Sequence, residues 1–125
     1  MCVGARRVEE LAVWQLGDEL RTKIHSITAI GPAARDCRFR DQIRDAASSV
    51  TRNIAEGFGR YRHREFAQFL SIARGSLFEV KDHLRDGVAR RHWNTAAAKE
   101  LDDLCNRTIA AVTYFIRYLR STSEP

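Results

Sequence analysis

Proline and cysteine are scarce in this sequence, and neither marks a structural framework. The 125 residues include only two prolines, Pro32 and Pro125, so almost nothing in the chain interrupts long helices. The three cysteines, Cys2, Cys37 and Cys105, show no CxxC or CxxH spacing. A zinc site needs clustered ligands and a disulfide framework needs paired cysteines, so we expect reduced thiols and no metal.

Long apolar runs are also missing. None comes near the ~18 residues that indicate a membrane-spanning helix, and the basic residues 1–7 are not followed by the apolar core of a signal peptide. The composition, 44% hydrophobic and 30% charged, is ordinary for a globular protein. We therefore expect one cytoplasmic domain over residues 1–125, without a membrane partner.

Four segments carry apolar residues at helical spacing, and none shows the alternation typical of a strand. They predict helices over about 8–30, 36–57, 62–88 and 95–120. Because the connections are short, consecutive helices should pack antiparallel. The predicted fold is all-α, an up-down-up-down antiparallel four-helix bundle. The inward face predicted for the second helix consists of Phe39, Ile43, Ala46, Ala47, Val50, Ile54 and Phe58.

Four residues carry local expectations within these helices. Gly17 interrupts an apolar stripe, which favours a close contact with a neighbouring helix. Asp36 stands where an N-cap of the second helix is expected, and Gly57 where a left-handed residue would end that helix. Gly75 belongs to a patch of small residues in the third helix that would let another helix approach closely.

Positive charge is concentrated in one part of the chain. Residues 35–64 contain eight arginines and four acidic residues, which gives them +4 of the total net charge of +5. Within them, the turn after the second helix reads GFGRYRHR over residues 57–64. Arginines neutralise phosphates, and an exposed aromatic ring can stack on a base. The candidate nucleic-acid-binding residues are Arg44, Arg52, Arg60, Tyr61, Arg62, His63 and Arg64.

The same turn has a plainer interpretation. Its arginines can pair with Glu56, Glu65 and the carbonyl groups at the helix end, which would make the turn a solvated loop. The sequence leaves both interpretations open.

Residues 53–60 read NIAEGFGR, and residues 65–79 continue with the pattern EF..FL.IA.GSL.E. Upstream stand QIR.AA at residues 42–47 and LAVWQ at residues 11–15. Over roughly residues 8–120 the chain resembles the 23S rRNA intervening-sequence family of four-helix-bundle proteins. The resemblance implies a four-helix bundle without established enzymatic activity, in some members a homopentamer with a basic surface. It also implies a link to RNA, because related accessory proteins of diversity-generating retroelements are thought to work with a reverse transcriptase.

The chain departs from the family pattern in two places near the turn, and its connection over residues 90–94 is also short. Val50, Thr51 and Arg52 replace a SIP tripeptide, and Arg62 stands where the family often has a serine that caps the third helix. Loss of such a cap costs about 1 kcal/mol, so we expect a more mobile and more basic turn.

We interpret most of this family signature as structural or subunit-contacting. Its polar members suggest interhelical pairs of Glu56 with Arg60, Glu65 with Arg62 or Glu79 with Arg74, which would fix bundle register or subunit contacts. The signature residues are Asn53, Glu56, Gly57, Glu65, Gly75 and Glu79.

No arrangement of residues indicates an active site. A di-metal bundle needs two Glu-x-x-His motifs, whereas Glu79 and His83 are four residues apart and have no second copy. His25, His63 and His92 lie in separate segments without a carboxylate at ligand spacing. We therefore predict no catalytic residue, no metal ligand and no cofactor.

The fourth helix carries apolar residues on more than one side, which is typical of a helix that faces another subunit. We expect a homo-oligomer, and the family resemblance makes a pentamer the first expectation. Two functions compete: binding of RNA or DNA, and a scaffold that contacts an acidic protein partner or a reverse transcriptase. The extra apolar residues are Trp14, Trp93, Tyr114, Phe115, Ile116 and Tyr118.

Overall fold

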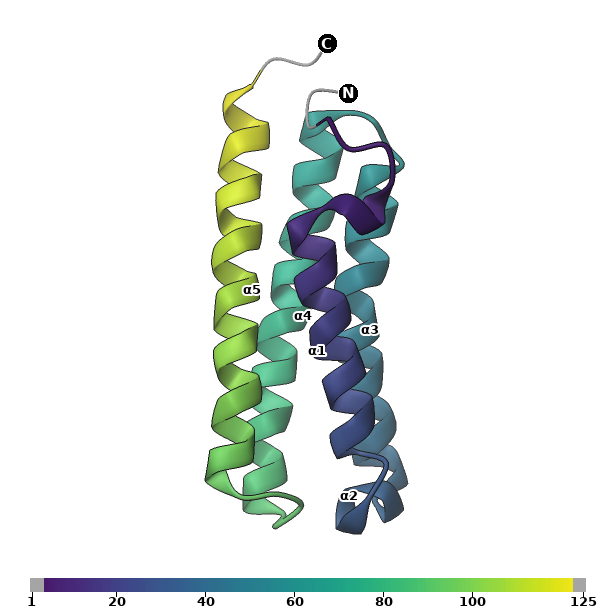
Figure 1. Cartoon of the computed structure of the whole chain (residues 1–125), viewed down its shortest axis with the longest axis vertical. Coiled ribbons are helices and arrows are strands. Elements are labelled where there is room, and N and C mark those ends of the chain that lie inside the picture. The colour runs from purple at the N-terminus through teal and green to yellow at the C-terminus, as the bar shows by residue number, and fades with distance from the viewer. Residues whose placement is uncertain (1–3, 123–125) are drawn as a thin grey trace.

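The computed structural model describes residues 4–122, and this part of the chain is helical without any strand (Figure 1). The predicted all-α class is therefore confirmed. Over the described residues the elements are a 3-10 helix, η1 (Val8–Glu10), and the α-helices α1 (Ala12–Ile27), α2 (Gly31–Arg35), α3 (Cys37–Phe58), α4 (His63–Ala89) and α5 (Thr95–Ser121).

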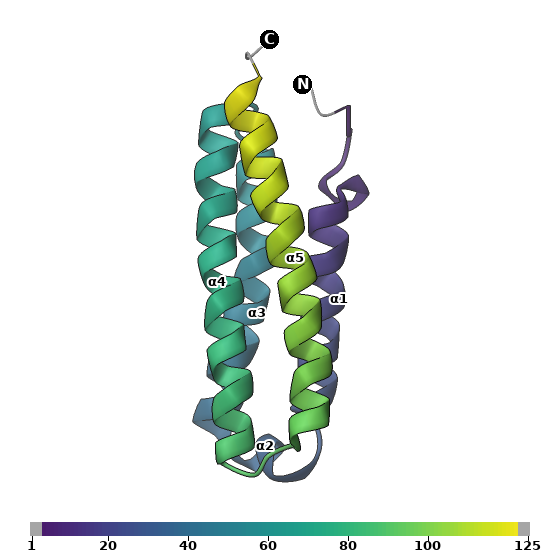
Figure 2. The same ribbon diagram turned by 90° about the vertical axis from the view of Figure 1, so that its left-hand side faces the viewer.

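The long helices α1, α3, α4 and α5 lie side by side along their length (Figures 1 and 2). Contacts join α3 to α4, α4 to α5, and α1 to both α3 and α5. The apolar stripes that the spacing predicts meet in the space between these helices. The inward face predicted for the second helix is buried, except for Phe58, which is half-buried. The largest fully buried side chains are Leu20, Ile24, Ile43, Ile54, Leu70, Leu77, Leu84, Leu104, Leu119, Val50, Val80 and Val112.

The chain before α3 differs most from the expected helix over 8–30. That segment divides into η1 and α1, which ends at Ile27, and a further short helix, α2, precedes α3. Gly31 takes the left-handed φ of 67°, and Pro32 stands in the first turn of α2. A proline is tolerated there because the first backbone N–H groups of a helix have no intrahelical acceptor. Pro32 thus begins a short helix.

The prediction that Gly57 ends the helix in a left-handed conformation is wrong. Gly57 lies buried inside α3, and the left-handed residue of the turn is Tyr61, with φ 65°. A Cβ atom added to Gly57 would lie 2.8 Å from Phe66 Cδ1 and 2.8 Å from Phe69 Cβ. The glycine therefore serves the close approach of α3 and α4.

Gly17 and Gly75 differ in how closely other helices approach them. The close contact expected at Gly17 is confirmed, since a Cβ there would lie 3.1 Å from both Thr51 Cγ2 and Val50 Cγ1. Gly75 is exposed, and apart from its two chain neighbours and the backbone of its own helix no heavy atom of the described chain comes within 4 Å of the position of its Cβ. The expected contact at Gly75 is thus not made within this chain.

Asp36 occupies the N-cap position of α3, as expected, but its side chain makes no capping hydrogen bond. Its carboxylate accepts hydrogen bonds from Arg90 Nη1 at 3.1 Å and from His92 Nε2 at 2.8 Å, both in the α4–α5 connection. His92 thus has a carboxylate partner that its place in the sequence does not reveal. The hydrogen bond from His92 is the largest cause that holds the pKa of Asp36 below its usual value, and the charge and hydrogen bond of Arg90 are smaller contributions.

Candidate nucleic-acid interface

Four residues, 59–62, join α3 to α4 and present an aromatic ring between two arginines. Tyr61 is 73% exposed, and its neighbours Arg60 and Arg62 are exposed too. The N-cap position of α4 falls on Arg62, whose side chain makes no capping hydrogen bond, as the missing serine predicts. The turn therefore exposes an aromatic ring and two arginine side chains at one end of the molecule.

The turn arginines lie against two glutamates. Arg60 Nη2 is 3.0 Å from Glu56 Oε2, Arg60 Nη1 is 3.7 Å from Glu65 Oε2, and the guanidinium carbon lies 5.1 Å from the centre of the Phe69 ring. Arg62 Nε is 3.9 Å from Glu65 Oε1. The predicted pairs of Glu56 with Arg60 and of Glu65 with Arg62 form, but as local contacts between residues four and three positions apart at the turn and not as the expected pairs between helices. Exposed ion pairs of this kind contribute about 0–1 kcal/mol and are screened by salt.

Arg52 and Arg44 differ in exposure along α3. Arg52 has a side chain 60% exposed and lies 3.8 Å from Asp45, a loose surface contact. Arg44 is half-buried and donates a hydrogen bond to Thr28 Oγ1 at 2.8 Å. The pKa of His25 is lowered by burial, and then by the charges of Arg44 and Arg21. Arg44 therefore ties α3 to the end of α1, away from the turn.

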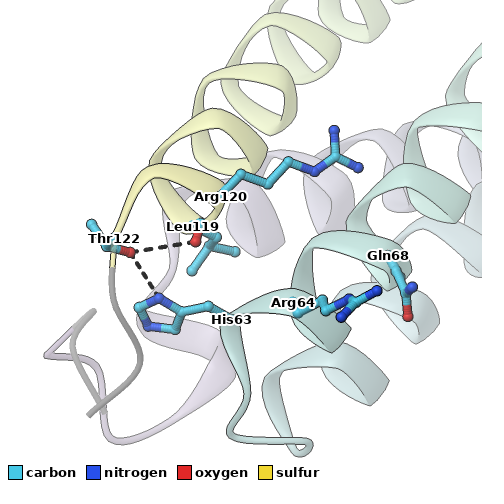
Figure 3. A pocket seen from close by; sticks show the side chains of 6 residues that line it. All are labelled: His63, Arg64, Gln68, Leu119, Arg120 and Thr122. Carbon is cyan, nitrogen blue, oxygen red and sulfur yellow. Dashed lines mark hydrogen bonds between the residues drawn. The ribbon is translucent and has the colours of Figure 1, made fainter.

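His63 is the buried member of the predicted set, at 3% exposure. Its Nδ1 lies 2.7 Å from Thr122 Oγ1, just past the end of α5 (Figure 3). The Thr122 hydroxyl also lies within hydrogen-bond distance of the Tyr118 carbonyl oxygen, at 3.1 Å. His63 thus ties the start of α4 to the end of α5.

Beside this contact lies a pocket of about 330 Å³ between α4 and α5 (Figure 3). It brings Arg64, one of the predicted residues, together with Arg120 of α5, which the sequence interpretation did not include. The signal for Arg120 is the segment 104–122, which contains three arginines and no acidic residue. The residues that line the pocket are His63, Arg64, Gln68, Leu119, Arg120 and Thr122.

Asn53 of the signature joins α3 to α4 through a hydrogen-bond network. Its Nδ2 donates to the Ser49 carbonyl at 2.8 Å and to Ser49 Oγ at 2.9 Å, and Ser49 Oγ lies 2.9 Å from Ser76 Oγ. Together with the close approach at Gly57, this network fixes how the two helices meet. The signature residues Asn53 and Gly57 are thereby explained as structural.

The expected pair of Glu79 with Arg74 does not form. Glu79 Oε2 lies 3.6 Å from His83 Nε2, one turn further along α4. Arg74 instead reaches across to α5, where its Nη1 donates to Thr113 Oγ1 at 3.2 Å. Helical spacing alone does not tell which of two neighbours a side chain selects.

Ligands for a metal do not gather anywhere in residues 4–122: no group of three or more His, Cys, Asp or Glu side chains is placed to hold an ion. Cys37 is an exposed free thiol, and Cys105 is a buried one whose pKa is raised by burial to about 12. Cys2 lies outside the described residues. Within the same range, no helix is long and apolar enough to cross a membrane.

Comparison with known proteins gives one family. The family model described as 23S rRNA-intervening sequence protein matches residues 9–113, from within η1 to the middle of α5. No curated protein matches the chain.

Proposed function

Because the chain belongs to the 23S rRNA-intervening sequence protein family, we propose that it is a non-enzymatic, homo-oligomeric protein that binds nucleic acid, RNA in the first place. We further propose that its helices form an up-down-up-down antiparallel bundle and that it acts in the cytoplasm. The family name suggests a small protein associated with ribosomal RNA, and phosphate-rich ligands of that kind suit a basic protein of net charge +5.

The observation that carries the proposal is the turn between α3 and α4. It holds Tyr61, 73% exposed, between Arg60 and Arg62, with Arg52 two turns earlier on α3. Guanidinium groups bind phosphates through paired N–H donors, and an exposed ring offers a stacking surface to any base. The proposed recognition is therefore tolerant of sequence and dominated by the nucleic-acid backbone.

The glutamates near the turn do not oppose this function. The contacts of Arg60 and Arg62 with Glu56 and Glu65 are exposed and range from 3.0 to 3.9 Å. Because such pairs contribute about 0–1 kcal/mol, a phosphate can replace one carboxylate contact at little cost. The glutamates also hold the arginines near the turn before a ligand arrives.

Exposed apolar side chains on α4 and α5 support the proposed homo-oligomer. Ile72 and Phe78 on α4 are 52% and 54% exposed, and Tyr114 on α5 is 74% exposed. Gly75 lies between the first two, with room beside it for another helix. Light scattering should give a mass that is a multiple of 14.3 kDa, with five copies expected first. A monomer at micromolar concentration would contradict this part of the proposal.

These apolar residues also favour a second candidate, a scaffold that binds a protein partner. An acidic partner or a reverse transcriptase would then meet the arginines and the apolar face together. Co-purification that survives nuclease treatment, together with no affinity of the pure protein for RNA, would select this candidate.

The proposed function is tested by measuring RNA affinity at several salt concentrations. The variant R52A/R62A removes two exposed arginines from α3 and the turn, and R38A/R85A removes two exposed arginines from the opposite end of α3 and α4 as a control. We expect a shallower salt dependence and weaker binding for the first variant, and a smaller change for the control. Equal affinity of both variants would remove the turn as the binding site.

A further inference from the structure

A groove between α1 and α5 leaves apolar side chains of both helices open to solvent. Its hollow measures about 440 Å³, and no charged residue lines it. Tyr114 stands at this groove and is 74% exposed. The groove is formed by residues 11–13 and by Ala111, Tyr114, Phe115 and Tyr118 of α5. We name it the α1–α5 groove.

Arg107 lies one turn before this groove on α5. It precedes Ala111 by four positions and Tyr114 by seven, so the three residues share one side of the helix. Arg107 is exposed, and Asp103, the acid one turn before it, pairs with Lys99 at 3.1 Å. Within residues 4–122 no carboxylate forms an ion pair with Arg107. The apolar groove therefore continues into a positive charge.

The outer side of α4 carries a stripe of the opposite character. Ile72, Gly75 and Glu79 are all exposed and follow one another by three and four positions, so they lie within about 60° of one another around the helix. Ile72 is 52% exposed, and no atom of another helix in the described chain comes within 4 Å of a Cβ at Gly75. The stripe is thus apolar and flat before it ends in a negative charge. We name these three residues the α4 stripe.

Gly75 and Glu79 are also the signature residues that contacts within one chain explain least. Asn53 and Gly57 fix how α3 meets α4. Glu79 reaches only His83 on its own helix, 3.6 Å from Nε2, and Gly75 meets no other helix among the described residues. Both therefore face solvent in a single chain and are available to a second copy.

The α4 stripe and the α1–α5 groove lie at the same height along the molecule. The helix α5 has α4 on one side and α1 on the other (Figure 2). Arg74 Nη1 donates to Thr113 Oγ1 at 3.2 Å. Seven residues later on α4, Lys81 Nζ donates to Asn106 Oδ1, which is seven residues earlier on α5. These two contacts place residues 69–80 of α4 level with residues 107–118 of α5.

From this match of shape, charge and height we infer that the α1–α5 groove of one copy binds the α4 stripe of a second copy. When two copies stand parallel, Ile72 and Gly75 of one lie level with the groove of the other, and Glu79 lies level with Arg107. The flat position at Gly75 gives the exposed ring of Tyr114 a place to pack. Such a contact buries apolar surface on both copies and pairs two opposite charges at its edge.

This inference rests on the homo-oligomer of the proposed function and names the two surfaces that form it. The groove and the stripe are different surfaces of one chain, so the contact is head-to-tail, and each copy uses both surfaces.

Reversal of the two charges tests the pairing. Glu79→Arg brings two positive charges together and Arg107→Glu two negative ones, so each change should raise the protein concentration at half-assembly by about 10-fold. The double variant E79R/R107E restores opposite charges and should return to within about 3-fold of the wild type. Arg38→Glu reverses an exposed arginine on α3 and is the control, which should assemble like the wild type. Sedimentation of the full chain over a dilution series measures all four.

Tyr114→Ala tests the apolar part of the contact without a change of charge. Loss of the exposed ring should raise the concentration at half-assembly by about 10-fold, whereas the circular dichroism of the diluted protein should stay that of the wild type. Single variants that assemble like the wild type, or a double variant that assembles no better than the single ones, would overturn the inference.

The same series separates this inference from the proposed homo-oligomer. An oligomeric wild type whose mass none of these variants alters would keep the homo-oligomer and exclude these two surfaces. A wild type that stays monomeric at every concentration would overturn both. A monomeric wild type that loses a co-purifying protein on Glu79→Arg would assign the stripe to a different partner and overturn the second copy.

Discussion

The substitution Gly57→Ala tests the close contact between α3 and α4. Its new methyl group would lie 2.8 Å from Phe66 Cδ1, 2.8 Å from Phe69 Cβ and 3.3 Å from the Phe66 carbonyl oxygen. The Phe66 ring is 3% exposed, and the other two atoms are fixed to the backbone of α4. None of them can swing aside, so the two helices must separate to admit the methyl group.

Two opposing effects set the change that Gly57→Ala makes to the free energy of unfolding. Alanine in a helix interior is more favourable than glycine by about 1 kcal/mol, whereas an extra methyl group in a packed interface costs about 1–3 kcal/mol. Because backbone atoms are involved, we expect the upper part of that range and a net loss of about 1–2 kcal/mol. Gly75→Ala is the matched control, since no atom of another helix in the described chain lies within 4 Å of its new methyl group. The free energy of unfolding of the Gly75→Ala protein should rise by the full ~1 kcal/mol that separates alanine from glycine in a helix.

Thermal unfolding at a fixed protein concentration measures both changes. For a chain of this size, 1 kcal/mol moves the Tm by about 3–5 °C, so the expected order is Gly75→Ala above wild type and Gly57→Ala below it. A Gly57→Ala protein as stable as the wild type would refute the packing explanation of the signature glycine. A Gly75→Ala protein that loses stability as it is diluted would place Gly75 in a subunit contact.

Three further predictions concern single side chains. The hydrogen bond from His92 lowers the pKa of Asp36 in the folded protein. The contribution of Asp36 to stability is therefore complete above its unfolded pKa of 3.8 and is lost as the pH falls through its folded pKa. The difference in Tm between wild type and D36N should shrink from pH 6 to pH 3, and a constant difference would contradict this. Burial raises the pKa of Cys105 to about 12, so iodoacetamide at pH 8 should modify Cys37 and spare Cys105 until urea unfolds the chain; peptide mass spectrometry that finds equal rates would speak against the buried thiol. Tyr61→Gly removes a left-handed non-glycine residue, so the free energy of unfolding should stay equal or rise by up to about 1 kcal/mol. The same change removes one stacking surface, so RNA binding should weaken by roughly 1–3 kcal/mol, and unchanged affinity would exclude stacking.

The sequence predicts the helices well because burial repeats along the chain with the period of a helix. The later three predicted segments match α3, α4 and α5 closely, since each carries a long apolar stripe between clear interruptions. Gly57 was misassigned because a glycine permits two things, a positive φ and a close approach of another helix, and the sequence does not separate them. Only the neighbours in space, Phe66 and Phe69, decide between the two.

The candidate site was predictable where its residues are consecutive and not where they come from distant helices. The turn with Arg60, Tyr61 and Arg62 is visible in the sequence as a run. His63 belongs to the same run, yet its partner Thr122 is 59 residues away, and the contact buries the imidazole. Arg120 was missed because its neighbour in the pocket, Arg64, comes from another helix.

The most direct test of the central claim is the affinity of the wild-type protein for single-stranded RNA at 50 mM and 200 mM salt. With phosphate contacts from Arg52, Arg60 and Arg62, the account predicts binding at the lower concentration and affinity about 20-fold weaker at the higher one. No binding at 50 mM salt, or an affinity that the fourfold rise in salt leaves unchanged, would contradict it.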